Sequence, residues 1–272
     1  MRNTLTLVTI LIVLALAALQ NSAVAQSSPT PNEIFKAGYA AYQSGNYDLA
    51  IKHYTTAINA DPTRNYFYYN RGLAYKAIGN YNLAAADFRT SNQYKPTAEA
   101  YYQLGLLAYE KNDLETALAE FEKARELKED LERMNFYMGM IYYKNNRYEE
   151  AVRSFQTYTR YVKNFPDAYY YRGMSEAKLG RYSDAIASFN FAMTFKKYDW
   201  KLYYKMYEIY LAMNDKHNAL YSLTMVIEVG EKKPEYYEER ARLFKDIGDL
   251  VRYEEDLQTA NEMRYATASI QK

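Results

Sequence analysis

The chain has 272 residues, with 34 Lys and Arg against 33 Asp and Glu, and a formal net charge of +1. This balance lacks the basic excess of a nucleic-acid binder, so no nucleic-acid partner is expected. The sequence contains no cysteine, which excludes disulfide bonds, and its 33 tyrosines indicate that aromatic burial stabilises the fold.

Residues 1–25 have the layout of a secretory signal peptide. Arg2 gives a positive start, residues 5–19 form an apolar run without a charge, and Ala23-Val24-Ala25 is a small-x-small cleavage signature. A transmembrane helix needs roughly 20 apolar residues, so this shorter run predicts cleavage and export, with the periplasm as the simplest destination. Two alternatives remain: secretion, or retention of the segment as a membrane anchor, the only way in which the membrane would be a partner.

After a short linker at 26–30, one position recurs at intervals of 33 or 34 residues. It is occupied by Gly38, Gly72, Gly105, Gly139, Gly173, Tyr207 and Ala241. We call it the glycine position of each repeat. A period in this range indicates a solenoid of stacked supersecondary units.

A second set of residues predicts where helices end. Seven residues after each glycine position comes a Gly or an Asn: Gly45, Gly79, Asn112, Asn146, Gly180, Asn214 and Gly248. These two residue types tolerate the left-handed conformation that closes a helix. Each repeat is therefore predicted to hold one helix, a short turn and a second helix.

The second helix of each repeat carries a small residue and then a large one. In the first repeat, Ala50 lies twelve residues and Tyr54 sixteen residues after Gly38. The residues that match Tyr54 in the following repeats are Phe88, Phe121, Phe155, Phe189, Leu223 and Leu257. We expect the two helices to approach closely at the small residues, with the large side chain filling the space they leave.

These residues resemble the tetratricopeptide repeat family, most clearly in the second repeat, which runs Tyr68-Tyr69-Asn70-Arg71-Gly72 and continues through Gly79, Ala84 and Phe88. The resemblance implies an all-α fold, an α-solenoid of stacked helix-turn-helix units in a right-handed superhelix. Seven repeats are expected over 31–267, followed by a tail at 268–272. Their approximate ranges are 31–64, 65–97, 98–131, 132–165, 166–199, 200–233 and 234–267.

Three residues depart from the family pattern. Tyr207 and Tyr253 replace small residues in the last two repeats, and Glu176 stands where an aromatic or aliphatic residue is usual. Terminal repeats of a solenoid are often atypical because one face meets water. The C-terminal repeats are therefore predicted either to cap the array or to dock another chain, which includes weak self-association.

The resemblance also implies that the first helix of each repeat lines an inner groove. Aromatic residues recur three residues before the glycine position, and others follow it by one or four residues. The predicted partner-binding residues are Phe35, Tyr39, Tyr42, Tyr69, Asn70, Tyr102, Tyr109, Phe136, Tyr143, Tyr170 and Tyr204. They predict a groove for an extended peptide or a partner helix. The alternative is that the rings only pack neighbouring helices together.

Catalysis is not expected from this sequence. His53 and His217 fall on second helices without a partner at metal-ligand spacing, and no glycine-rich phosphate loop is present. We therefore predict no catalytic residue, no metal and no cofactor. The predicted function is a non-enzymatic protein-interaction scaffold in the cell envelope. The alternatives are a carbohydrate or cell-wall polymer binder that uses the Tyr and Phe rings, or a non-catalytic subunit of an envelope enzyme complex.

Overall fold

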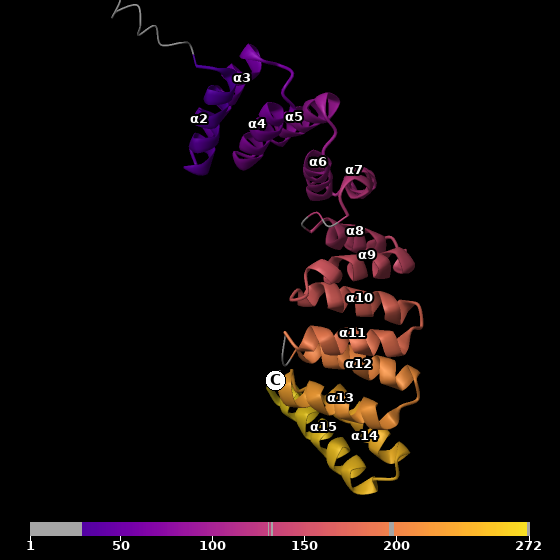
Figure 1. Ribbon diagram of the computed structural model, residues 1–272. Coiled ribbons are helices and arrows are strands. Elements are labelled where there is room, and N and C mark those ends of the chain that lie inside the picture. The colour runs from indigo at the N-terminus through magenta and orange to yellow at the C-terminus, as the bar shows by residue number, and fades with distance from the viewer. Residues whose placement is uncertain (1–28, 130, 132, 196–198, 271–272) are drawn as a thin grey trace, which may run out of the picture. The chain divides into compact units, whose positions relative to one another are not determined.

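The computed structural model describes residues 29–129, 131, 133–195 and 199–270, so the predicted signal peptide lies outside the described residues. Over these residues the chain forms helices and no strand, which confirms the predicted all-α repeat solenoid (Figure 1). The helices, taken in pairs as repeats 1 to 7, are α2 (Pro31–Gln43) and α3 (Tyr47–Ala60), α4 (Asn65–Ala77) and α5 (Tyr81–Tyr94), α6 (Ala98–Glu110) and α7 (Leu114–Leu127), α8 (Met134–Lys144) and α9 (Tyr148–Tyr161), α10 (Pro166–Lys178) and α11 (Tyr182–Met193), α12 (Trp200–Ala212) and α13 (Lys216–Val229), and α14 (Pro234–Asp246) and α15 (Leu250–Ile270).

The chain divides into two compact units between Pro96 and Thr97. The first unit holds repeats 1 and 2, and the second holds repeats 3 to 7. Within the second unit, α8 to α15 stack as successive layers (Figure 1). None of the described helices combines the length and the apolar character needed to cross a membrane.

The turn inside every repeat is closed by the residue that the sequence indicates. All seven Gly and Asn residues that follow the glycine position by seven have a positive φ, between 58° and 84°. In repeat 1 the Asn46 N–H then donates to the Ala41 carbonyl at 2.9 Å, which satisfies an otherwise unpaired carbonyl at the end of α2. The predicted helix-turn-helix plan is confirmed in all seven repeats.

Close approach of the two helices explains the recurring glycine. A Cβ atom added to Gly105 would lie 2.5 Å from a ring carbon of Phe121, which is fully buried. The same clash, at 2.6–2.8 Å, arises in the other four glycine repeats between the glycine and the ring sixteen residues later. In repeat 6 the sizes are exchanged, since Tyr207 fills the glycine position and the smaller Leu223 faces it in one core cluster. The departure at Tyr207 is thus a compensated exchange of volume.

An arginine of repeat 2 forms an ion pair inside its own repeat and a hydrogen bond to repeat 1. The Arg71 guanidinium, one residue before Gly72, donates to both carboxylate oxygens of Asp87 at 2.8 Å. It also donates to the Thr55 hydroxyl of the preceding repeat at 3.1 Å. Repeat 7 repeats this arrangement with Arg240, Asp256 and Thr224. We call this arrangement the arginine bridge.

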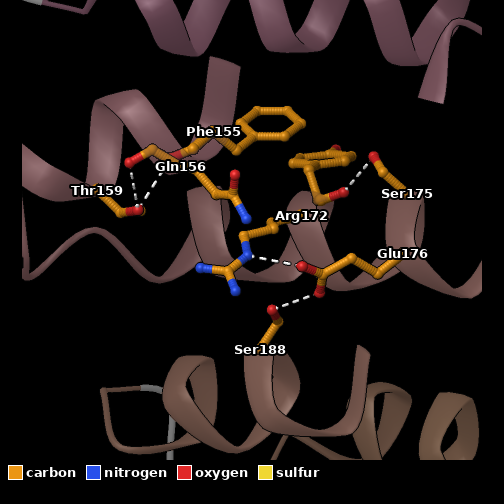
Figure 2. Close-up of polar contacts among 8 residues, drawn as sticks. Phe155, Gln156, Thr159, Arg172, Ser175, Glu176 and Ser188 are labelled. Carbon is orange, nitrogen blue, oxygen red and sulfur yellow. Dashed lines mark hydrogen bonds and ion pairs between the residues drawn. The ribbon is translucent and has the colours of Figure 1, made fainter. Parts of the chain in front are cut away.

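Glu176 belongs to a variant of the arginine bridge in repeat 5 (Figure 2). Ser188 occupies the position of Asp87, so the second helix offers no carboxylate to Arg172. Glu176 supplies it from the first helix: Arg172 Nε donates to Glu176 Oε1 at 2.8 Å, and the Ser188 hydroxyl donates to Glu176 Oε2 at 2.6 Å. The unexpected acid is therefore a relocated partner for a half-buried arginine.

The hydroxyl of Tyr54 leads to a stability prediction. Tyr54 is fully buried, and its hydroxyl has no hydrogen-bond partner among the described residues. Repeats 2 to 5 have Phe at this position, so Tyr54→Phe is expected to raise the free energy of unfolding by about 1 kcal/mol. The reverse change, Phe88→Tyr, should lower it by about 1–3 kcal/mol, because it buries a hydroxyl without a partner. Urea unfolding followed by circular dichroism measures both, and equal stability of Tyr54→Phe and the parent chain would contradict the argument.

The same residue predicts a dependence on alkaline pH. Burial raises the pKa of Tyr54 to about 12. Because the folded pKa lies above the unfolded value, the stability linked to the neutral phenol is complete below pH 10 and is lost as the pH rises toward 12. The Tyr54→Phe variant should lack this part of the alkaline destabilisation.

One position on α15 is polar although the matching position in the other repeats is apolar. In repeats 1 to 6, the residue thirteen after the glycine position is apolar and at least partly buried, as Ile51 and Val152 illustrate. In α15 the matching residue is Glu254, which is exposed. Leu250 and Val251 of the same helix are exposed too, so capping of the array and docking of another chain both stay predictions. The helix continues to Ile270, so residues 268–270 of the predicted tail are helical.

Candidate functional site

The six predicted rings that precede the glycine position by three residues all take part in packing between helices. Tyr69, Phe136 and Tyr170, for example, have ring centroids 5.7–6.0 Å from Phe88, Phe155 and Phe189 of their own repeats. Phe35 and Tyr102 contact Tyr54 and Phe121 in the same way, and Tyr204 contacts Tyr236 of α14 at 5.5 Å. Tyr102 is only 3% exposed, so it has almost no surface for a partner. The packing alternative therefore describes what these rings do in the fold.

The remaining predicted residues of the first unit are arranged separately. Tyr39 is exposed, and Tyr42 makes an edge contact with Tyr47 at 5.3 Å. The Asn70 side-chain amide donates to the Tyr66 carbonyl at 2.7 Å, one turn earlier in α4. That bond fixes the amide orientation and leaves Asn70 in a local role.

Two predicted tyrosines of the second unit instead form pairs between neighbouring first helices. Tyr109 of α6 contacts Tyr137 of α8 at 5.1 Å, and Tyr143 of α8 contacts Tyr171 of α10 at 5.7 Å, both edge to face. We call these four residues the tyrosine ladder. Each pair joins the position four after one glycine position to the position two before the next.

The ladder rests on the rings of the second helices. Tyr137 stacks on Phe121 with centroids 6.0 Å apart and an interplanar angle of 16°. Tyr171 stacks on Phe155 at 6.2 Å and 20°. The sequence analysis missed Tyr137 and Tyr171, although they share the position of Asn70 in repeat 2, and aligning that position across the repeats would have found them. The predicted Tyr109 and Tyr143 therefore belong to one connected set of aromatic contacts with the rings of Phe121 and Phe155.

The phenols of Tyr109 and Tyr143 are neutral at physiological pH. Burial raises the pKa of Tyr109 and of Tyr143 above the ordinary value. The rings of Tyr148 and Tyr171 lie 5.8 and 5.7 Å from the Tyr143 ring, and both also raise the pKa of Tyr143. A neutral phenol both donates and accepts hydrogen bonds, so the ladder offers apolar rings with polar tips.

A lysine side chain lies beside the ladder. The Lys144 ammonium lies 5.5 Å from the centroid of the Tyr109 ring.

Over the residues that the structure describes, no group of three or more His, Cys, Asp or Glu could hold a metal ion. His53 lies on α3 and His217 on α13.

Family models match more than half of the chain. A model described as TPR repeat matches residues 38–79, and a model described as Tetratricopeptide repeat matches residues 69–131 and 138–192. The matched ranges end before repeats 6 and 7, the two in which the sequence departs most from the pattern. No curated protein matches the sequence.

Solved structures share the fold over most of the chain. A tetratricopeptide repeat protein from Parabacteroides merdae is 18% identical, with a TM-score of 0.54, over 89% of this chain and 96% of that one. The C-terminal part of a TPR repeat-containing protein from Cytophaga hutchinsonii is 18% identical, with a TM-score of 0.59, over 84% and 95% of the two chains. YrrB, a TPR protein with an unusual peptide-binding site, is 20% identical, with a TM-score of 0.56, over 67% and 94%. At these identities the similarity supports the fold alone.

Proposed function

The chain belongs to the tetratricopeptide repeat family, whose members generally serve as protein-interaction scaffolds, and we propose that it binds a peptide segment or partner helix along the first helices of repeats 3 to 6. The observation that carries this proposal is the tyrosine ladder, which gathers four rings from three successive first helices. Apolar rings with polar tips suit recognition of an extended segment, because they supply contact area and hydrogen bonds together.

The proposal assigns no catalytic step to this protein. It places the protein outside the cytoplasm, because the features of residues 1–25 are those of a signal peptide. The partner would then be a component of the cell envelope. Mass spectrometry of the protein purified from its native host tests this point: a mature chain that begins at Gln26 supports export, whereas a chain that begins at Met1 contradicts cleavage.

The ladder is tested by replacing one tyrosine of each pair with alanine. A Tyr109→Ala/Tyr143→Ala variant should capture its envelope partner at least about tenfold more weakly than the parent chain, because central aromatic contacts dominate interface energies. The matched control is Tyr161→Ala/Tyr221→Ala, which removes two exposed tyrosines from second helices. Circular dichroism first establishes equal helix content. Equal weakening by both pairs, or by neither, would refute a ladder-specific site.

Carbohydrate binding is the weaker alternative for this surface. A sugar ring stacks on an open aromatic face, but Phe121 and Phe155 already cover one face of Tyr137 and Tyr171. Isothermal titration with glycan fragments separates the two cases. Heat that disappears in the Tyr109→Ala/Tyr143→Ala variant would favour the polymer-binding alternative over the scaffold.

A further inference from the structure

The tyrosine ladder stops at the interface of repeats 5 and 6. The positions that hold Tyr109 and Tyr137, and then Tyr143 and Tyr171, are occupied next by Ala177 of α10 and Lys205 of α12. Two rings are therefore replaced by a methyl group and a flexible chain with a charged end. A cavity of about 220 Å³ opens at this place, and both Ala177 and Lys205 line it.

The cavity has apolar walls. Met174 and Ala177 of α10 and Ile209 and Ala212 of α12 line it, and α11 adds the buried ring of Phe189 and the side chain of Tyr182. Phe189 is the third member of the series in which Phe121 and Phe155 each carry a stacked tyrosine of the next repeat. No tyrosine is present at position 205 to continue that series. The cavity therefore borders the two positions at which the series would continue.

Its size suits one aromatic side chain. A cavity of roughly 150 Å³ lined by apolar residues accommodates benzene in another protein, so about 220 Å³ holds a single ring with room for its methylene group. Ligand pockets for larger molecules usually have roughly 300–1,000 Å³. The volume therefore favours a side chain of a partner protein over a cofactor-sized molecule.

The charges at its rim favour an acidic neighbour for that ring. Lys178 and Lys205 both line the cavity, together with Glu208. Lys205 pairs with Glu208 at 2.8 Å, but both side chains are at least 36% exposed. An exposed pair of this kind is worth about 0–1 kcal/mol, so a carboxylate of a partner can compete for Lys205.

We propose that the gap between Ala177 and Lys205 receives an aromatic side chain of a partner protein, with an adjacent carboxylate at Lys178 and Lys205. This inference rests on the proposed function, because it names the chemistry recognised at one end of the same surface. The partner's ring completes the tyrosine ladder, and its carboxylate pairs with Lys178 and competes with Glu208 for Lys205.

The first test uses small probes and methyl NMR of the whole mature chain, with labelled Ala, Met and Ile methyl groups. N-acetyl-L-phenylalanine should shift the methyl signals of Met174, Ala177, Ile209 and Ala212, whereas N-acetyl-L-alanine should not. N-acetyl-L-phenylalaninamide, which lacks the carboxylate, should bind about two- to fivefold more weakly, the range of an exposed ion pair. The absence of shifts from both aromatic probes would overturn the proposal.

Two variants make the test specific. Ala177→Tyr/Lys205→Tyr introduces a third tyrosine pair that should fill the gap, and it should abolish binding of both aromatic probes. Lys178→Gln/Lys205→Gln leaves the apolar walls in place and should remove only the preference for the carboxylate probe. Shifts that persist in a folded ladder-completed variant would overturn the site, and an unchanged preference in the lysine variant would overturn the role of the charges.

The same variants separate this inference from the proposed function. An envelope partner that is weakened by Tyr109→Ala/Tyr143→Ala but bound equally well by Ala177→Tyr/Lys205→Tyr would leave the scaffold in place and refute the ring site. A partner weakened by both would support the two together. Capture unaffected by Tyr109→Ala/Tyr143→Ala would refute the ladder itself, whatever the probes do in the gap.

Discussion

Replacing Arg172 by methionine is expected to lower the free energy of unfolding of repeat 5 by about 3–5 kcal/mol. This loss of stability comes from the carboxylate of Glu176, which remains buried after its arginine partner is removed. Glu176 is only 2% exposed, and without Arg172 its remaining hydrogen bond among those described comes from the Ser188 hydroxyl. A buried charge that has lost its ionic partner is far more costly than the absence of the pair. Urea unfolding followed by circular dichroism measures the loss.

The other repeats suggest how to restore the stability of repeat 5. In repeat 2 the carboxylate comes from Asp87, and Tyr75 takes the position of Glu176, with the Arg71 guanidinium 5.8 Å from its ring centroid. Glu176→Tyr/Ser188→Asp therefore gives repeat 5 the same residues as repeat 2 at these two positions. This double variant should unfold within about 1.5 kcal/mol of the parent chain, the usual limit for a substitution that leaves no cavity or unpaired charge.

Single variants complete the cycle. Ser188→Asp alone places a second carboxylate beside Glu176 with one arginine between them, and should be destabilising because like charges crowd a poorly solvated site. A double variant no more stable than the sum of the two single changes would show that the carboxylate cannot be relocated. The arginine bridge would then differ in kind between repeats 2 and 5.

Replacing Gly105 by valine is expected to cost about 3 kcal/mol. An added Cβ at this position would lie 2.5 Å from the Phe121 ring, which is fully buried and cannot move aside without disturbing the core between α6 and α7. The change also adds a β-branched residue to a helix, which is a smaller effect. Ala119→Val, on the exposed face of α7, is the matched control and should cost about 0.5 kcal/mol from helix propensity alone.

Repeat 7 provides the compensating change for this clash. There the glycine position holds Ala241, and Leu257 replaces the aromatic ring. Gly105→Ala/Phe121→Leu should therefore be more stable than Gly105→Ala alone, although each change removes part of the parent packing. If Gly105→Ala and Gly105→Val are no less stable than the parent, the close approach does not explain the recurring glycine.

The candidate site shows which contacts a repeat pattern can predict and which it cannot. The recurrence of Tyr109 and Tyr143 four residues after the glycine position selected two members of the ladder from sequence. The pattern treated Tyr102 and Phe136 as equivalent candidates, yet these rings face the second helix of their own repeats. Tyr102 and Tyr109 are seven residues, about two turns, apart and lie on nearly the same face of α6, so helix periodicity alone does not separate a ring that packs inside its repeat from one that contacts the next.

The features that each repeat encodes locally can be predicted from the sequence alone. The seven turn residues from Gly45 to Gly248, the close contacts beneath the glycines and the two helices of every repeat depend on residues within about 16 positions of one another. Such contacts recur with the repeat and can be read by aligning the sequence with itself.

Which residues of different helices become partners depends on how the helices pack. The hydrogen bond from Ser188 to Glu176, the pairing of Tyr143 with Tyr171 and the gap between Ala177 and Lys205 each depend on how two helices face one another. A periodic pattern gives the same score to a residue whatever stands opposite it. Packing makes the distinction, because a buried charge needs its counter-charge and a buried ring needs its neighbour within contact distance.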